Sequence, residues 1–196
     1  MATHPATLGR LFEDYVVGDV YQHPMGRTIT DTDTDTDTDT DTDTDNAWIT
    51  CLSINTNQNH FNSHLAATNP ITDGKVIVNS GLTIALVLGL SVIDMSQNAV
   101  ANLQFTDVKL AHPVYVGDTI YAESICTDLR LSQSRPYAGI VSMVTRGINQ
   151  DGEVVISWKR SVMVATRERG IGQNYFPEVK APSLTELTGT TEGSVG

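Results

Sequence analysis

Basic residues are scarce in this sequence, which has 12 lysines and arginines against 23 aspartates and glutamates and a formal net charge of −11 at pH 7. Such a charge disfavours contact with nucleic acid phosphates or anionic membranes, so we expect neither as a partner. Eight of the aspartates lie in one stretch, Asp31 to Asp45. Without these eight the net charge would be −3, which is ordinary for a small globular protein.

Cysteine is also rare, and Cys51 and Cys126 lie far apart in apolar surroundings. We therefore predict two buried thiols in a reducing compartment and no disulfide framework. Residues Met1 to Arg10 lack the apolar centre of a secretory signal, which predicts a cytoplasmic protein. The sequence has no zinc-ligand spacing, phosphate-binding glycine loop or nucleophile elbow, so we expect neither a metal nor a redox cofactor.

Long apolar runs are limited to Ile77 to Ile93, which is short for a membrane span of about 20 residues and contains Asn79 and Ser80. We interpret Val76 to Ile93 as a helix buried on nearly every face, with Leu82 among its core residues. The length of 196 residues favours one domain, from Leu11 to Arg169. We expect a flexible N-terminus over residues 1–10 and a loosely held tail over residues 170–196.

A strict Thr-Asp alternation fills Asp31 to Asp45. Calcium binding by spaced carboxylates is one interpretation, but the run lacks the glycine turn and the final glutamate of the calcium loop. Charge repulsion favours a disordered surface insertion instead. Thr44 or Asp45 could still cap a helix that begins in the apolar stretch Ala47 to Ile54.

The remaining elements follow from periodicity and turn signals. Phe12 to Tyr21 predicts a turn into a first strand, which Arg27 to Thr30 continues, and His64 to Thr68 predicts a helical turn. Gln150-Asp151-Gly152 is typical of a hairpin turn. Four strands are predicted after residue 100: Ala101 to Leu110, Thr119 to Asp128, Ala138 to Asn149 and Glu153 to Ala165. A helix followed by a strand meander predicts an α+β fold.

The chemistry is concentrated in N-T-N-Q-N-H-F-N-S-H, Asn55 to His64, and in the start of the long helix. Amides and imidazoles are costly to bury unless they bind one another or a ligand. The first turn of the helix, with Ser80 and Gly81, offers free N–H groups that can bind an acyl oxygen. The two segments together predict a reaction site.

Three sequence motifs resemble those of the MaoC-like dehydratases, the (R)-specific enoyl-CoA hydratase group with the hot-dog fold. They are N-T-N-Q-N-H-F-N (Asn55 to Asn62), V-N-S-G-L-T (Val78 to Thr83) and H-P-V-Y-V-G-D-T-I-Y-A (His112 to Ala122). The resemblance implies a long helix wrapped by a curved antiparallel sheet, and a homodimer or a larger assembly of dimers. Ser134 to Gly139 and Asn149 to Gly152 are similar to the mesaconyl-CoA and itaconyl-CoA hydratases, which implies a branched C5 dicarboxylic acyl-CoA substrate.

The resemblance also implies roles for individual residues. His60 occupies the family's histidine position and would take a proton from water, since the pKa of histidine is ordinarily about 6.5. The family's aspartate is replaced by Asn55, which can orient water but cannot act as a general base. Asn57 would help to bind substrate, and the N–H groups of Ser80 and Gly81 would bind the thioester oxygen.

A free carboxylate on the substrate would pair with an arginine, and Arg135 is the first candidate, with Arg146 the second. Coenzyme A would enter only as part of the substrate. Alternatives remain for the residues: His60 as a structural loop residue, Arg135 as a turn cap before Pro136, and His112 in packing at a strand end. His64 is interpreted as a surface residue. The alternative functions are an acyl-CoA thioesterase and a noncatalytic acyl-CoA-binding subunit.

Overall fold

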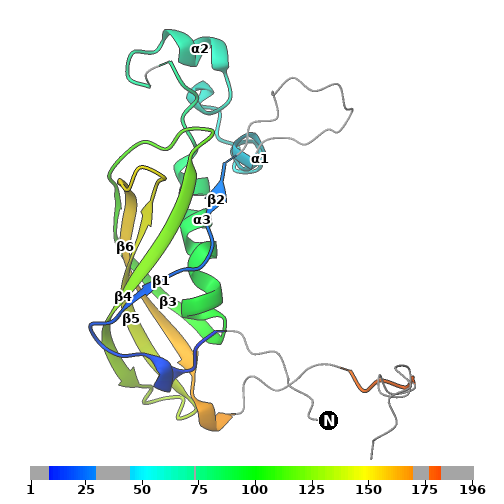
Figure 1. The fold of residues 1–196 in the computed structure, drawn as a ribbon, viewed down its shortest axis with the longest axis vertical. Helices are drawn as coiled ribbons and strands as arrows, with labels where there is room; N and C mark the ends of the chain where they lie inside the picture. The colour runs from blue at the N-terminus through cyan, green and yellow to red at the C-terminus, as the bar shows by residue number, and fades with distance from the viewer. Residues whose placement is uncertain (1–8, 30–44, 73, 170–176, 182–196) are drawn as a thin grey trace, which may run out of the picture.

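One helix, α3 (Ser80–Ser91), lies against a six-stranded antiparallel sheet (Figure 1). The computed structural model describes residues 9–29, 45–72, 74–169 and 177–181. The predicted α+β arrangement, with a single long helix covered by the sheet, is confirmed. The helices α1 (Asp45–Leu52) and α2 (Ser63–Thr68) lie at the same end of the molecule as the start of α3 (Figure 1). Of the two, α1 lies beside the N-terminal end of α3.

The strand order is β1-β4-β5-β6-β3, and β2 also pairs with β4. Only β4, β5 and β6 form the predicted meander, because β3 crosses over to pair with β6 instead of β4. Alternating side chains and the turn at Gln150 to Gly152 were sufficient to predict the four long strands. Gly152 adopts a φ of 83° in that turn, a conformation that glycine tolerates without strain. The strands are β1 (Val20–Gln22), β2 (Arg27–Thr28), β3 (Ala99–Leu110), β4 (Thr119–Leu131), β5 (Ala138–Ile148) and β6 (Val154–Ala165).

Several predicted boundaries are wrong. The long helix starts at Ser80 rather than Val76, because Ile77 is extended and bridges to Tyr115. After Ser91 the chain continues as one π-helical segment, Val92–Ser96. The single N-terminal strand is instead a 3-10 turn at Phe12–Asp14 followed by the separate strands β1 and β2.

The core lies between α3 and the sheet. Leu82, Val87 and Leu90 of α3 pack in one buried cluster with Ile156 and Trp158 of β6. A Cβ at Gly147 on β5 would overlap the side chain of Val87, so this glycine lets the helix approach the sheet closely. Fully burying aliphatic side chains of this size contributes roughly 1.5–3 kcal/mol each.

The prediction that the helix is buried on nearly every face is wrong for the single chain. Gly81, Ala85 and Gly89, spaced by four residues, are exposed and form a strip of small residues along α3. The prediction of two buried thiols is half right. Cys126 is buried, which raises the pKa of its thiol, whereas Cys51 is exposed because it lies on the outer side of α1.

Three predictions fall largely outside the described residues: the flexible N-terminus at 1–10, the disordered insertion at 31–45 and the tail at 170–196. Asp45, the last residue of the acidic run, is described as the first residue of α1, and its carboxylate accepts a hydrogen bond from Arg27 at 2.8 Å. The expected capping role of Thr44 lies outside the described part of the chain. Among the described helices, none has the length and apolar character needed to cross a membrane.

A buried arginine joins the edge strand to the rest of the fold. Arg160 of β6 is 3% exposed and donates to the side-chain oxygen of Asn102 on β3 at 2.5 and 3.1 Å. Its third contact is the Ser91 hydroxyl at the end of α3, at 3.4 Å. Burial lowers the pKa of Arg160 to about 10. The guanidinium remains charged at neutral pH and connects β3, β6 and α3.

The start of α3 is fixed by Asn79, which is 7% exposed. Its side-chain oxygen accepts from the Gly81 N–H at 2.8 Å and its amide nitrogen donates to the Thr50 hydroxyl of α1 at 3.2 Å. We expect Asn79→Ala to lower the free energy of unfolding by about 1–2 kcal/mol, because it removes a helix cap and leaves a buried hydroxyl without this partner. Urea unfolding followed by circular dichroism measures the change.

Asn62→Ala is the matched control for this prediction. Asn62 caps the six-residue helix α2 by accepting from Leu65 N–H at 3.0 Å, but it is only half-buried. We expect Asn62→Ala to lower the free energy of unfolding by about 0.5 kcal/mol, the low end of the usual cost of losing a cap. Equal losses for the two variants would contradict the view that the cap of α3 is coupled to the core.

A second buried polar group, His23, connects the N-terminal segment to the sheet. Its side chain is fully buried, with Nδ1 3.3 Å from Asp94 Oδ2 and Nε2 3.0 Å from the Ser124 hydroxyl. Burial lowers the pKa of His23 below its ordinary value, and the Asp94 carboxylate opposes this only in part. The folded protein therefore holds a neutral imidazole where the unfolded chain would be protonated.

This arrangement predicts that stability falls as the pH drops below about 6.5, where the unfolded chain binds a proton that the folded chain does not. The melting temperature should decrease from pH 7 to pH 5 by scanning calorimetry. In His23→Gln the decrease should be smaller, although the variant is less stable at pH 7. His64→Gln, which replaces an exposed histidine, should keep the wild-type slope. A His23→Gln slope equal to that of wild type would refute this origin of the pH dependence.

Candidate active site

The first turn of α3 presents one open backbone donor. Asn79 is the N-cap, and its side chain engages the Gly81 N–H that the sequence had suggested as a donor. The Leu82 N–H is engaged by the Asn79 carbonyl at 2.9 Å. The N–H of Ser80 makes no hydrogen bond to any described residue. Of the two predicted donors, only the Ser80 N–H is therefore both oriented by the helix and available to bind an acyl oxygen.

A cavity of about 260 Å³ lies beside this turn. One wall consists of Ile77, Val78, Ser80 and Thr83, and the other of residues 110–114 at the end of β3 and in the loop that follows. Among the described residues, its polar side chains are hydroxyls and the imidazole of His112, and no aspartate or glutamate lines it. The cavity can thus receive a group whose oxygen meets the helix start.

His60 ends the 3-10 turn Gln58–His60 and is half-buried. Its Nδ1 lies 2.9 Å from the carbonyl oxygen of Ile77, a residue of the cavity wall. Because a carbonyl can only accept, Nδ1 must carry the hydrogen, and the neutral ring then has its lone pair on Nε2. The geometry thus assigns His60 the tautomer of a base, anchored to the wall of the cavity.

The loop before His60 is built from successive asparagines. The side-chain oxygen of Asn55 accepts from the Asn57 N–H at 3.0 Å, and that of Asn57 accepts from the Asn59 N–H at 3.1 Å. Ile54, just before them, adopts a φ of 54°, which is strained for a β-branched residue. The amide nitrogen of Asn55 donates to no described residue and is free to bind water. Asn57 has a clear structural role, and its predicted substrate contact stays a prediction.

Sequence reasoning missed Asn46, which holds these parts together. This residue of α1 is 1% exposed, and its amide nitrogen donates to the carbonyls of His60 at 2.8 Å and Ile77 at 3.4 Å. Its side-chain oxygen accepts from the Asn79 N–H at 2.8 Å. The available signal was an asparagine on the core side of an apolar helix, which seldom occurs without a polar partner.

The two predicted arginines lie elsewhere in this chain. Arg135 is in the hairpin between β4 and β5, at the end of the sheet away from α1 and α2, and contacts Met163. Arg146 binds the carboxylate of Glu123, which lowers the pKa of that glutamate. The chain does not bring either to the start of α3, so a role of Arg135 in substrate binding stays a prediction. His112, expected to pack at a strand end, is instead exposed and lines the cavity.

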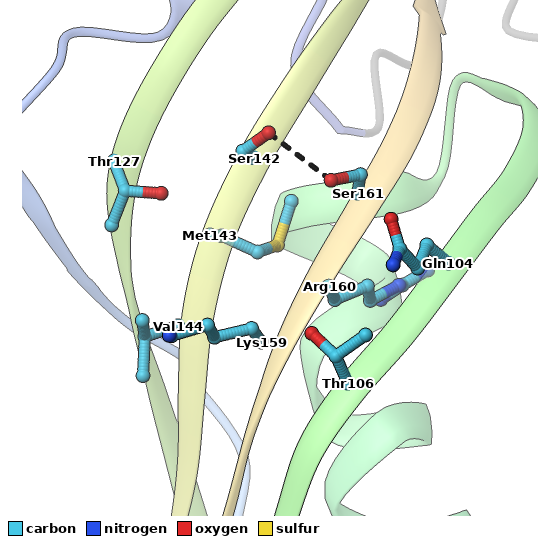
Figure 2. Close-up of a pocket in the computed structure, with 9 residues that line it drawn as sticks. All are labelled: Gln104, Thr106, Thr127, Ser142, Met143, Val144, Lys159, Arg160 and Ser161. Atoms are coloured by element: carbon cyan, nitrogen blue, oxygen red, sulfur yellow. Dashed lines mark hydrogen bonds between the residues drawn. The ribbon is translucent and has the colours of Figure 1, made fainter.

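A second hollow of about 270 Å³ lies across β3, β4, β5 and β6 (Figure 2). Hydroxyl groups dominate it, and those of Ser142 and Ser161 bind each other at 3.1 Å. Its amine, Lys159, is paired with Asp107 at 2.7 Å. The hollow therefore offers neither an unpaired base nor a helix terminus, and the cavity at α3 is the better candidate.

Comparison with known proteins identifies the family of the chain. A family model described as mesaconyl-CoA hydratase matches residues 3–174. The chain is 32% identical over 186 residues to the mesaconyl-CoA hydratase of Cereibacter sphaeroides, which covers 95% of this chain and 48% of that protein. A MaoC domain protein dehydratase from Chloroflexus aurantiacus has a TM-score of 0.63 and 30% identity, over 89% of this chain and 45% of that chain.

A Mycobacterium tuberculosis protein with a double hotdog fold has a TM-score of 0.62 at 20% identity, over 91% of this chain and 50% of that one. The chain thus spans about half the length of the relatives it matches. The predicted MaoC-like resemblance and hot-dog fold are confirmed. Since the family model extends over most of its sequence, the chain belongs to the mesaconyl-CoA hydratase family.

Proposed function

We propose that this protein adds water to, or removes it from, the double bond of an enoyl-CoA thioester, with a branched C5 dicarboxylic acyl-CoA of the mesaconyl type as substrate. The observation that carries the proposal is the 2.9 Å hydrogen bond that holds His60 Nδ1 on Ile77 and leaves Nε2 as the base. Ile77 also lines the cavity at the start of α3. Family membership supplies the substrate class.

In the hydration direction, His60 Nε2 takes a proton from water while the water oxygen bonds to the β-carbon of the substrate. The electron pair of the double bond moves to the thioester, and protonated His60 then gives its proton to the α-carbon. The free amide nitrogen of Asn55 holds the water. One imidazole is thus used as base and then as acid, which removes the need for the carboxylate that Asn55 replaces.

The charge that develops on the thioester oxygen needs a donor fixed before the reaction. The Ser80 N–H at the positive end of α3 serves this role, and such a donor is typically worth about 3–4 kcal/mol. Gly81 contributes by its small size, since its N–H is used by the cap. His112, at the other wall of the cavity, can donate to the free carboxylate of a C5 substrate.

The activity is tested by mixing the purified chain with mesaconyl-CoA or crotonyl-CoA. Loss of enoyl thioester absorbance, with a product heavier by one water, supports a hydratase. Release of free coenzyme A, detected with a thiol reagent, would indicate a thioesterase instead. Binding of the thioester without either change would indicate a noncatalytic acyl-CoA-binding subunit.

We expect His60→Ala to lower kcat by about 10²–10⁴-fold, the usual contribution of a positioned acid-base group. His64→Ala is the matched control, because it removes an exposed imidazole from α2 four residues further on. It should keep kcat within about twofold. A His60→Ala variant that folds and retains activity within a few-fold would disprove the assignment of the base.

We further propose that a second copy of this chain completes the site. β3 is an edge strand of 12 residues that exposes Leu103 and Val108, and such an edge favours pairing with another strand. The cavity is lined by residues just beyond β3, and the exposed strip of Gly81, Ala85 and Gly89 runs along α3. Relatives about twice this length fit a pair of such units.

A homodimer should have twice the 21.2 kDa mass of the chain in size-exclusion chromatography with light scattering. The double variant Leu103→Lys/Val108→Lys should run as a monomer with reduced activity, because it places two charges at the edge. Val17→Lys, at an exposed position near β1, should remain dimeric. A monomeric wild type with full activity would contradict this proposal.

A further inference from the structure

We propose that Asn46 is the positioning residue of this active site: it sets the tautomer of His60 and the place of His60 relative to the start of α3. The inference rests on the proposed function for its kinetic consequences, but the state of His60 can be measured without turnover. Among the described residues, the Asn46 side chain forms hydrogen bonds with main-chain groups of the site, and it is not expected to touch substrate.

The Asn46 side chain uses both of its ends within the protein. Its two N–H hydrogens face the carbonyls of His60 and Ile77, at 2.8 and 3.4 Å, and its oxygen receives the Asn79 N–H at 2.8 Å. The three partners lie 14, 31 and 33 residues away in sequence. At 1% exposure, these contacts substitute for water around the whole amide.

His60 and Asn46 both donate to the carbonyl of Ile77. It accepts from His60 Nδ1 at 2.9 Å and, through its second lone pair, from Asn46. A carbonyl held in this way has one orientation, so it selects the Nδ1–H tautomer and fixes the direction of Nε2. Without Asn46, the Ile77 carbonyl can turn and the imidazole can adopt its other tautomer, which has no lone pair on Nε2.

The Asn46 side chain also fixes the distance between His60 and the start of α3. Asn46 binds the base loop through His60 and the helix start through the N–H of Asn79, whose own side chain caps α3. The base and the Ser80 donor therefore move as one unit. Catalysis is sensitive to such alignment, because a displacement of about 1 Å can cost about 100-fold in rate.

Two variants separate the contributions of the amide nitrogen and the side-chain oxygen of Asn46. Asn46→Ala removes all three contacts. Asn46→Asp keeps an oxygen for the Asn79 N–H but has no N–H for the two carbonyls. Thr145→Val is the control for general destabilisation. Thr145 lies on β5, away from the site, where it is fully buried and hydrogen-bonded to Ser124 of β4.

The His60 tautomer is read by long-range ¹H–¹⁵N NMR of histidine-labelled protein, with His60→Asn to assign its signals. Wild type should show the Nδ1–H form. In both Asn46→Ala and Asn46→Asp, His60 should shift toward the Nε2–H form. Each variant should also lose about 10- to 100-fold in kcat, measured in the range where its kcat no longer depends on pH. KM should change by less than about threefold. Thr145→Val should match wild type in tautomer and kcat.

The outcomes distinguish this inference from the proposed function. A wild type that shows the Nε2–H form would overturn the role of Asn46 whether or not either variant folds. Folded Asn46 variants with the wild-type tautomer and kcat within threefold would overturn it as well. A wild type that hydrates no enoyl-CoA, with a tautomer that still depends on Asn46, would refute the function and leave the positioning role standing.

Discussion

The site depends on a buried chain of amide hydrogen bonds between Asn46 and the main chain at residues 60, 77 and 79. The Asn46 side chain is 1% exposed, so removing one of its partners leaves a buried amide group unsatisfied at a cost of about 1–3 kcal/mol. The bonds cross from α1 to the His60 loop and to the start of α3. The sheet and the packing of α3 provide a rigid base, and this polar layer places the chemistry on it.

The packing of α3 explains why the reactive groups gather at one end of the molecule. Val87 fits against Gly147, and Arg160 fastens the far end of the helix to β3 and β6. The helix can therefore neither slide nor turn without breaking close contacts. Its N-terminus becomes a fixed dipole, and the loops that surround it supply the base and the cavity wall.

The sequence predicted those features that depend on neighbours along the chain. Alternation and turn residues located the four long strands, and the density of amides in Asn55 to His64 located the His60 loop. What it could not predict depends on contacts distant in sequence. Asn46 directly follows the acidic run, where only Thr44 and Asp45 were considered as a helix cap, and its partners are up to 33 residues away. Ile77 was assigned to a helix because its pairing with Tyr115 is not visible locally. Arg135 lies in a sequence motif that resembles the family, but the hairpin between β4 and β5 places it at the other end of the sheet.

A comparison of two imidazoles shows why His60 rather than His23 suits the chemistry. His23 lies between Asp94 and Ser124 in an order that resembles a hydrolase triad. Yet Ser124 is 1% exposed and its hydroxyl also binds Thr145, so both ring nitrogens and the hydroxyl are fully used in the core. Burial also lowers the pKa of His23, which disfavours its accepting a proton. His60 is half-exposed and has Nδ1 anchored on Ile77, which lines the cavity, while its Nε2 has no hydrogen-bond partner among the described residues. An acid-base catalyst needs an oriented ring with a free nitrogen, and among these two histidines only His60 has it.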